Sequence, residues 1–317
     1  MSKDLRWKDT RVLVTGAGGF LGRAACERLL AAGARVHGGV HTPERPAPAG
    51  ITSHRIELLR PETLEAAVAA IEPAAVLHLA APVQLTRDPD AFPALTDAVL
   101  VATDRLARAC LGVGARLLYT GTCEEYGDGP APFSEAQAAR PVSPYSAAKA
   151  AAGHWLGCLS RTTALEAVVV RPFLTYGPGQ GGGRLIPAAI DAALDGRAFP
   201  MTDGQQTREV NFVDDMARGL ILAAGSGAAV GQLLNLGGGP ELAVLELVQR
   251  IFALCEADPA LVRPGALPRR AGEVRARFVG DHARARALLG YSPEVSLDEG
   301  LRRTIQAMRS ERARRTG

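Results

Sequence analysis

The segment RVLVTGAGGFLGRAACERLLAAGARVHGGV, residues 11–40, most constrains the fold of this chain. An apolar run at 12–14 meets a glycine cluster, helix-spaced apolar residues follow, and a second apolar run lies at Val36. This order predicts a strand, a tight turn, a helix and a second strand. The spacing G-x-x-G-x-x-G suits a backbone that approaches a pyrophosphate at a helix amino end, with glycines at Gly16, Gly19 and Gly22.

The end of the second predicted strand bears on which dinucleotide binds. An acidic residue there would bind a ribose hydroxyl, whereas a basic one would bind a 2′-phosphate. The segment VHGGVHTPER has no acidic residue before Glu44, but offers His41 and Arg45. These residues favour NADP(H), with NAD(H) as the alternative.

Alternating strand and helix patterns continue along the chain. We expect strands at Ile56–Leu58 and within AAVLHLAA, ARLLYTGT and LEAVVVRP, with helices at LEAAVAAI and in a long stretch ending at Cys110. Such alternation indicates an α/β fold, a Rossmann doubly wound parallel sheet with a smaller C-terminal substrate-binding domain. We assign 1–176 and 208–239 to the dinucleotide-binding domain, and 177–207 and 240–317 to the other.

Composition excludes several protein classes. Lys and Arg total 36 against 33 Asp and Glu, too small an excess for a nucleic-acid-binding face. No apolar run approaches a membrane span, and the first ten residues are polar, so we expect a cytoplasmic protein without a membrane partner. The five cysteines lack a CxxC pair, which predicts free thiols and no metal site. The 35 glycines exceed the roughly 22 expected from average usage, and most of the surplus lies at 16–22, 177–183 and 237–239.

The stretch LLYTGTCEEYGDG, followed by SPYSAAKAA, suggests catalysis. Tyr145 and Lys149 are four residues apart, so on a helix they share a face where the ammonium would lower the phenol pKa. An unperturbed tyrosine, with a pKa near ~10, needs such help to act as a base near neutral pH. Thr122 follows an apolar strand, at the edge where such sheets bind ligands. A solvated helix face would explain the Tyr/Lys pair equally well if it stood alone.

These motifs together resemble the extended short-chain dehydrogenase/reductase family, in particular the members that act on nucleotide-activated sugars. The similarity spans nearly the whole chain: TGAGGFLG is similar to the cofactor loop, HLAA at 78–81 to the fourth-strand signature, and Thr122, Tyr145 and Lys149 to the catalytic set. Four downstream stretches also match, namely RPFLTYGPG, TREVNFVDD, LLNLGGG and RAGEVRA.

The resemblance implies roles for individual residues. Tyr145 would exchange a proton with a sugar hydroxyl or ketone, Lys149 would hold the nicotinamide ribose, and Thr122 would orient the reacting oxygen. Substrate contacts would come from Thr122, Cys123, Arg208 and Arg270. The two arginines would bind the nucleotide diphosphate, because a guanidinium fork suits phosphate oxygens. The implied cofactor-binding residues are Gly16, Gly19, Phe20, Leu21, Gly22, His41, Arg45, Glu57, Leu58, Leu79, Ala80, Ala81, Tyr145, Lys149 and Pro172.

Some positions depart from the family pattern. Val99 stands where the family usually has Asn, and Glu209 where it usually has Asp. Family members commonly dimerise through the helix before Thr120 and the one carrying Tyr145, so we expect a homodimer.

The reaction type depends largely on Glu124. In family dehydratases a glutamate at this position removes the C5 proton of the sugar, and an acid at the preceding position helps water leave; here that position holds Cys123. Family 4-ketoreductases carry similar glutamates. We favour NADP(H)-dependent reduction of a nucleotide-linked 4-keto-6-deoxy sugar, because His41 and Arg45 suit NADP(H) and the chain is compact. The alternatives are a 4,6-dehydratase or 4-epimerase that regenerates its cofactor, and a cofactor-binding protein without turnover.

Overall fold

A central parallel sheet organises the molecule. The computed structural model describes residues 2–41, 46–83, 86–268 and 277–316. Within these residues seven strands pair in parallel in the order β11–β6–β5–β4–β1–β2–β3. The strands are β1 Arg11–Thr15, β2 Arg35–Val40, β3 Thr52–Arg55, β4 Ala75–His78, β5 Arg116–Thr120, β6 Ala167–Pro172 and β11 Leu233–Leu236. The expected Rossmann fold is confirmed, with its topological switch between β1 and β4.

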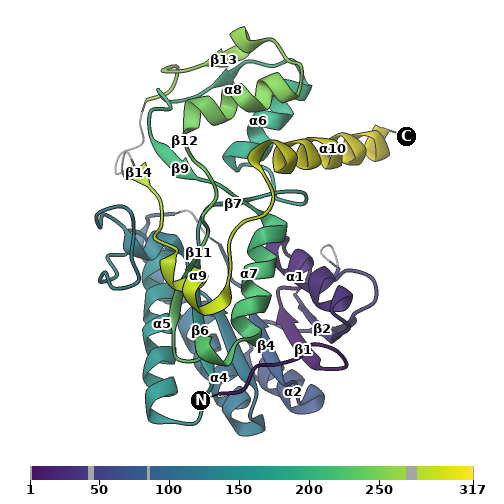
Figure 1. Cartoon of the computed structure of the whole chain (residues 1–317), viewed down its shortest axis with the longest axis vertical. Helices are drawn as coiled ribbons and strands as arrows, with labels where there is room; N and C mark the ends of the chain where they lie inside the picture. Colours follow the sequence, from purple (N-terminus) through teal and green to yellow (C-terminus); the bar gives the residue numbers. More distant parts are fainter. Residues whose placement is uncertain (1, 42–45, 84–85, 269–276, 317) are drawn as a thin grey trace.

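Helices cover both faces of this sheet (Figure 1). Along β1, Val12 and Val14 belong to one hydrophobic core and Leu13 to the other, because successive side chains in a strand point to opposite faces. One core includes residues of α1 Phe20–Ala31, α7 Val213–Gly225 and α9 Ala283–Leu289. The other includes residues of α2 Pro61–Ile71, α4 Ala102–Val113 and α5 Pro144–Thr162.

The strand expected at Ile56–Leu58 is wrong by a few residues, because β3 ends at Arg55. β3 is the edge strand beside β2, and its side chains are mostly exposed, so it has no apolar pattern. Ile56 is buried directly after the strand, which is why the apolar signal lies there.

The long helix expected before Cys110 is divided into several pieces. A 3-10 turn, η1 Pro89–Ala91, leads into α3 Phe92–Leu95, the π-helical η2 Thr96–Val101 and then α4. Val99, the departure from the family's Asn, is buried within the π-helical turn.

A second group of elements has its own core beyond the carboxyl ends of the strands (upper part of Figure 1). Its helices are α6 Leu185–Leu194, α8 Val244–Leu254 and α10 Leu297–Thr316. Its strands are β7 Thr175–Tyr176 with β10 Asn211–Phe212, β8 Phe199–Pro200 with β13 Val262–Arg263, and β12 Glu241–Ala243 with β9 Thr207–Glu209 and β14 Arg277–Phe278. Three further 3-10 turns lie at different places along the described chain: η3 Cys123–Tyr126 after β5, η4 Gly227–Ala229 after α7 and η5 Pro259–Leu261 after α8.

The chain passes between the two groups more than once. After the second group has begun, α7 and β11 return to the large sheet, and Ala285 and Tyr291 later join the same core. The domain boundaries stated above remain a prediction, since packing shows where residues lie rather than where a domain ends. The five cysteines are all free thiols, and among the described helices none is long and apolar enough to cross a membrane.

Candidate active site

The glycine turn between β1 and α1 is tightly built. Gly16 has a left-handed backbone (φ +71°), and a Cβ on Gly22 would lie only 2.0 Å from the Gly16 carbonyl oxygen. α1 begins at Phe20, followed by Leu21, and its N-cap residue Gly19 offers no side chain to its first N–H groups. Such uncapped N–H groups at a helix amino end attract phosphate, so the turn fits a dinucleotide pyrophosphate.

The end of β4 packs directly against this turn. The Ala80 N–H donates to Thr15 Oγ1 at 3.2 Å, and a Cβ on Gly16 would lie 2.9 Å from the Ala80 nitrogen. Thr15 Oγ1 also lies 2.8 Å from His78 Nδ1. Burial, and secondarily the charge of Lys149, lowers the pKa of His78 to about 3, so this ring is neutral. HLAA is therefore positioned beside the glycine turn, with Leu79 and Ala81 flanking Ala80.

Further residues predicted to bind the cofactor lie near the ends of β2, β3 and β6. His41 follows β2 and is exposed, and Arg45 lies outside the described residues. The carboxylate of Glu57 pairs with Arg55 at 2.8 Å and with Arg60 at 3.6 Å. Leu58 packs against the core that contains α2, and Pro172 ends β6.

The turn after β5 presents Thr122 and Glu124. Thr122 is the N-cap of η3: its Oγ1 accepts from the Glu124 N–H at 3.2 Å, while its own N–H donates to Glu125 Oε1 at 2.7 Å. Because the hydroxyl oxygen only accepts in this bond, its hydrogen can be donated to a ligand.

A buried ion pair supports this turn, and sequence reasoning missed it. Glu125, on the side of η3 away from solvent, bonds Arg171 of β6 at 2.8 Å. Burial raises the pKa of Glu125, although the Arg171 charge opposes the shift. The sequence signal is the second of two consecutive glutamates in CEEYG.

Tyr145 and Lys149 lie on the first turns of α5. Both are buried, and the Lys149 ammonium is 5.9 Å from the Tyr145 ring centre. Lys149 Nζ donates to the Thr120 carbonyl at 2.7 Å, and burial lowers its pKa to about 8.

The expected lowering of the Tyr145 pKa is wrong for this structure. Burial is the largest effect and raises the pKa, and the nearby carboxylates of Glu124 and Glu125 raise it further.

A hydrogen bond from Ser143, two residues before Tyr145, holds the Glu124 carboxylate. Glu124 Oε2 accepts a hydrogen bond from Ser143 Oγ at 3.3 Å. Ser143 is also the N-cap of α5, where its Oγ accepts from the Ser146 N–H at 3.1 Å. Sequence reasoning missed Ser143, although its cap position two residues before Tyr145 was a usable signal.

Cys123 differs from its neighbours in environment. It packs against the aromatic cluster of Tyr126, Phe133 and Phe173. Burial is the main cause that raises the pKa of this thiol to about 12, with nearby carboxylates adding to the shift. Cys123 is therefore protonated at neutral pH and is a weak acid.

The predicted phosphate-binding arginines are only partly described. Arg208 lies on β9, and its guanidinium carbon is 5.8 Å from the ring centre of Phe278 on β14. Arg270 lies outside the described residues.

Two hollows in the described part of the chain are not lined by Thr122, Tyr145 or Lys149. One runs between α5 and the β6–β11 edge, and its lining includes Glu125 and Arg171 but neither Thr122 nor Tyr145. The other lies between the loop at 177–182, α6 and α10. The candidate site is therefore identified from the side chains at the strand ends.

The chain is similar to known proteins along nearly its whole length. A model described as the NAD dependent epimerase/dehydratase family matches residues 12–237. A UDP-glucose 4-epimerase of Mycolicibacterium smegmatis is 33% identical, over 95% of this chain and 99% of the relative. A dTDP-glucose 4,6-dehydratase of Neisseria gonorrhoeae is 30% identical, over 96% and 97%. The structure of a dTDP-glucose 4,6-dehydratase from Streptomyces venezuelae with NAD bound superposes with a TM-score of 0.84 at 28% identity, covering 96% of this chain and 98% of that one.

Proposed function

The chain belongs to the NAD-dependent epimerase/dehydratase family of nucleotide-sugar enzymes, and on that premise we propose that it is a nucleotide-sugar 4,6-dehydratase. The similarities favour an enzyme that regenerates its cofactor over the 4-ketoreductase expected from the sequence. The observation that favours dehydration is the Glu124 carboxylate, a candidate base that accepts a hydrogen bond from Ser143, two residues before Tyr145.

The proposed chemistry divides proton transfers among the chain's residues. The nicotinamide, when bound, supplies a hydride acceptor and donor and, in its oxidised form, a positive charge. Tyr145 exchanges a proton with the C4 oxygen at its Oη, and Thr122 donates a hydrogen bond to the same oxygen. Glu124 removes the proton from C5, which a neighbouring C4 ketone makes acidic, and the C6 hydroxyl takes up a proton and leaves as water. The hydride taken from C4 would then return to C6.

A second candidate, 4-epimerisation, is supported by Cys123. Loss of water needs a proton donor near the C6 hydroxyl, and a thiol with a pKa raised to about 12 is a poor one. Epimerisation at C4 needs no such acid. The 33% identity to a UDP-glucose 4-epimerase agrees with this candidate.

Product analysis distinguishes these reactions. The purified protein is incubated with dTDP-glucose or UDP-glucose without added cofactor, and products are examined by mass spectrometry and proton NMR. Dehydration yields a product lighter by one water, whereas epimerisation yields equal mass with inverted C4. Stoichiometric oxidation of NADPH by a nucleotide 4-keto-6-deoxy sugar, with neither of these products, would instead establish the ketoreductase.

The cofactor proposed is NAD, in line with the family. The exposed His41 and the basic Arg45 leave NADP as the competing cofactor. Chromatography of nucleotide released from the denatured protein, together with Kd values for both cofactors, decides between them. A markedly lower Kd for the 2′-phosphorylated form would overturn the choice of NAD.

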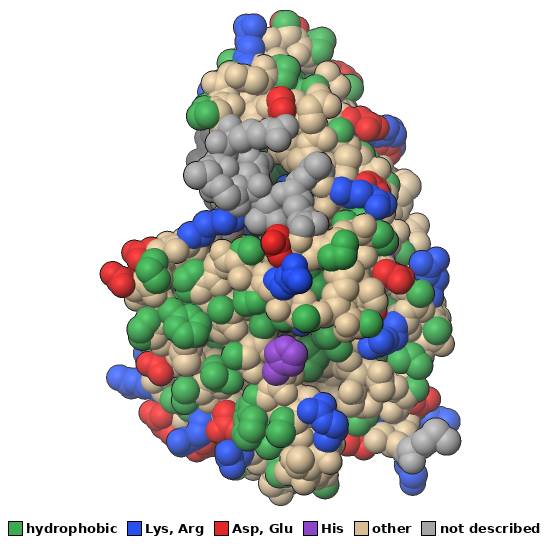
Figure 2. All heavy atoms as spheres, turned by 90° about the vertical axis from the view of Figure 1, so that its left-hand side faces the viewer, with side chains coloured by type: hydrophobic (Ala, Val, Ile, Leu, Met, Phe, Trp, Pro, Cys, Tyr) green, Lys and Arg blue, Asp and Glu red, His purple; other side chains and the backbone are tan. Residues whose placement is uncertain are grey.

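We also propose a homodimer formed through α4 and α5. Val101, Leu111 and Val113 are exposed on η2 and α4, and Figure 2 shows hydrophobic side chains gathered on the lower part of the face that includes α5. Light scattering on a size-exclusion column tests this, with Leu111→Glu expected to shift the protein to monomer. A monomeric wild type would refute the dimer.

A further inference from the structure

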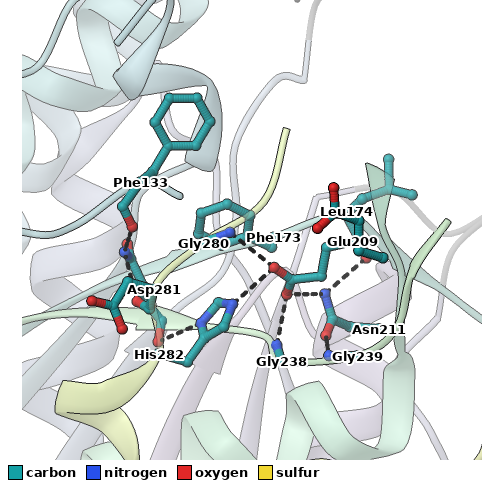
Figure 3. A network of polar contacts seen from close by, with 12 residues as sticks. Phe133, Phe173, Leu174, Glu209, Asn211, Gly238, Gly239, Gly280, Asp281 and His282 are labelled. Atoms are coloured by element: carbon teal, nitrogen blue, oxygen red, sulfur yellow. Dashed lines mark hydrogen bonds and ion pairs between the residues drawn. The ribbon is translucent and has the colours of Figure 1, made fainter. Parts of the chain in front are cut away.

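The carboxylate of Glu209 lies at the junction of three chain segments, 209–211, 237–239 and 280–282. It is 3% exposed. Oε1 accepts from the Gly238 N–H at 2.6 Å and from Asn211 Nδ2 at 3.0 Å, while Oε2 accepts from the Gly280 N–H at 3.0 Å and lies 2.8 Å from His282 Nε2 (Figure 3). Three donors and a histidine ring nitrogen therefore surround the two carboxylate oxygens.

Glycines let the backbone close around this carboxylate. A Cβ on Gly237 would lie 1.9 Å from Glu209 Oε1, and one on Gly239 would lie 2.0 Å from the Val210 carbonyl oxygen. The glycine cluster at 237–239 is therefore part of the enclosure of a charged group.

One arm of the network leads to the candidate catalytic turn. His282 Nδ1 lies 3.4 Å from the Asn235 carbonyl oxygen. The Asn235 side chain accepts from Tyr126 Oη at 2.7 Å and donates to the Phe133 carbonyl at 2.8 Å. Tyr126 is the last residue of η3, whose N-cap is Thr122.

The other arm leads to the predicted phosphate-binding strand. Glu209 follows Arg208 in β9, where Arg208 pairs in register with Phe278 of β14. The Phe278 ring packs edge-on against Phe133 at 4.8 Å between centres, and the Arg208 guanidinium carbon lies 5.8 Å from the centre of the same Phe278 ring. Polar and aromatic contacts thus connect Arg208 with the turn that begins at Thr122.

We propose that Glu209 is a positioning residue that fixes Arg208 relative to Thr122, and thereby the distance between the bound diphosphate and the reacting carbon. The inference rests on the proposed action on a nucleotide sugar. Holding the short strands together does not require a buried charge. The partly exposed ion pair of Arg277 on β14 and Glu241 on β12, at 2.8 Å, already does this. Burying a carboxylate instead costs desolvation and gives a defined geometry in return.

The test compares Glu209→Gln with a matched control. In glutamine an NH2 group replaces one carboxylate oxygen, so its hydrogens would face the Gly238 or the Gly280 N–H, whereas the side-chain volume is nearly unchanged. Asp215→Asn is the control. Asp215 is also buried, and it accepts hydrogen bonds of 3.0 Å from the Glu294 and Val295 N–H groups, which are not part of this network. Melting temperature, Kd for free UDP and dTDP, Kd for NAD, and KM and kcat for the sugar nucleotide are measured for each protein.

Glu209→Gln is expected to raise KM and the UDP or dTDP Kd by roughly 10- to 100-fold, with a smaller effect on kcat and none on the Kd of NAD. Asp215→Asn is expected to lower only the melting temperature. Glu209→Asp, which keeps the charge on a shorter stem, is expected to recover part of the nucleotide affinity.

The outcomes separate the two proposals. If Glu209→Gln leaves the nucleotide Kd and KM unchanged, or weakens NAD and nucleotide equally, the positioning role is wrong. If Glu209→Gln does not fold, Glu209→Asp and His282→Leu decide: unchanged nucleotide affinity in both overturns the role. If the wild type binds neither UDP nor dTDP and converts no sugar nucleotide, the proposed function fails, and this inference with it.

Discussion

At the scale of single residues, the surroundings of Tyr145 hold its proton on the phenol oxygen. Burial and the two neighbouring carboxylates raise the pKa, and Lys149 is bonded to the Thr120 carbonyl. The protonated phenol suits donation to a keto oxygen. Removing a proton from a hydroxyl requires an added positive charge, which an oxidised nicotinamide carries.

Tyr145→Phe is expected to reduce kcat at least about 100-fold, because it removes the proton-transferring group and little volume. The Kd of NAD is expected to stay unchanged, which isothermal titration would measure. Unaltered turnover would mean that Tyr145 does not transfer the proton; a wild type without turnover would support the cofactor-binding protein.

Lys149→Met is expected to change how stability depends on pH. Because burial lowers the Lys149 pKa from 10.5 to about 8, the unfolded state holds more protons between these values, and Lys149 makes stability rise with pH there. The variant lacks this contribution, so its stability relative to wild type is expected to be about 3 kcal/mol higher near neutral pH than above pH 10.5. Urea unfolding of both proteins at several pH values measures the difference; a difference independent of pH would contradict the prediction.

Ser143→Ala is expected to affect both stability and catalysis. It removes the α5 cap, at a cost of about 1 kcal/mol, and the hydrogen bond that holds Glu124. We expect kcat to fall roughly tenfold through misplacement of the base. Ser143→Thr keeps the hydroxyl and serves as the control; equal kcat values in both variants and the wild type would remove Ser143 from the site.

The places of Thr122, Tyr145 and Lys149 in the fold could be predicted, because a turn after a strand and the first turns of a helix are local features. The partners of Glu209 could not, since His282 and Gly280 lie more than seventy residues further along the chain. Only the register of β9 with β14 brings them together.

At the scale of elements, the glycine turn and the helices that follow it tolerate side chains very differently. Gly22 lies in α1 against the Gly16 carbonyl, whereas Gly112 lies in α4 with open space where its Cβ would be. The same substitution therefore has opposite expected effects at the two positions.

Gly22→Ala is expected to destabilise the protein by about 3 kcal/mol and to weaken NAD binding, because α1 must move away from the turn. Gly112→Ala is expected to stabilise by about 0.5–1 kcal/mol through helix propensity. Thermal unfolding and NAD titration compare the two. A Gly22→Ala protein that binds NAD like the wild type would show that the turn does not need this close approach.

Element boundaries followed the apolar pattern where elements are buried. The central strands β1, β4, β5 and β6 fall within the predicted stretches because nearly all their residues are buried. The edge strand β3 carries no such pattern, since its side chains face solvent. The π-helical turn at Thr96–Val101 depends on local hydrogen bonding that hydrophobic spacing does not encode.

At the scale of the whole molecule, Arg116 joins distant parts of the cofactor-binding half. It is 2% exposed on β5, and it donates to the carbonyls of Lys3, Ala224 and Gly225 as well as to Glu166. The carbonyls of Ala224 and Gly225 end α7, where no intrahelical donor remains.

Arg116→Met is expected to lower the free energy of unfolding by about 3 kcal/mol, because these carbonyls and the N-terminal segment lose their donors. Denaturant unfolding measures the loss. Arg35→Met, which removes an exposed ion pair with Asp9, is the control and is expected to change stability by under about 1 kcal/mol. Similar values for both variants would contradict the anchoring role.

The return of α9 to the large sheet has a consequence for how the protein is made. Ala285 and Tyr291 complete a core whose first residues, Val12 and Val14, are near the amino terminus. During synthesis α1 and α7 can cover most of this face before α9 is made, but the core is complete only after residue 291 has emerged from the ribosome. The nascent chain therefore keeps the part that α9 covers exposed until late in translation, and chaperone dependence is expected to end after residue 291.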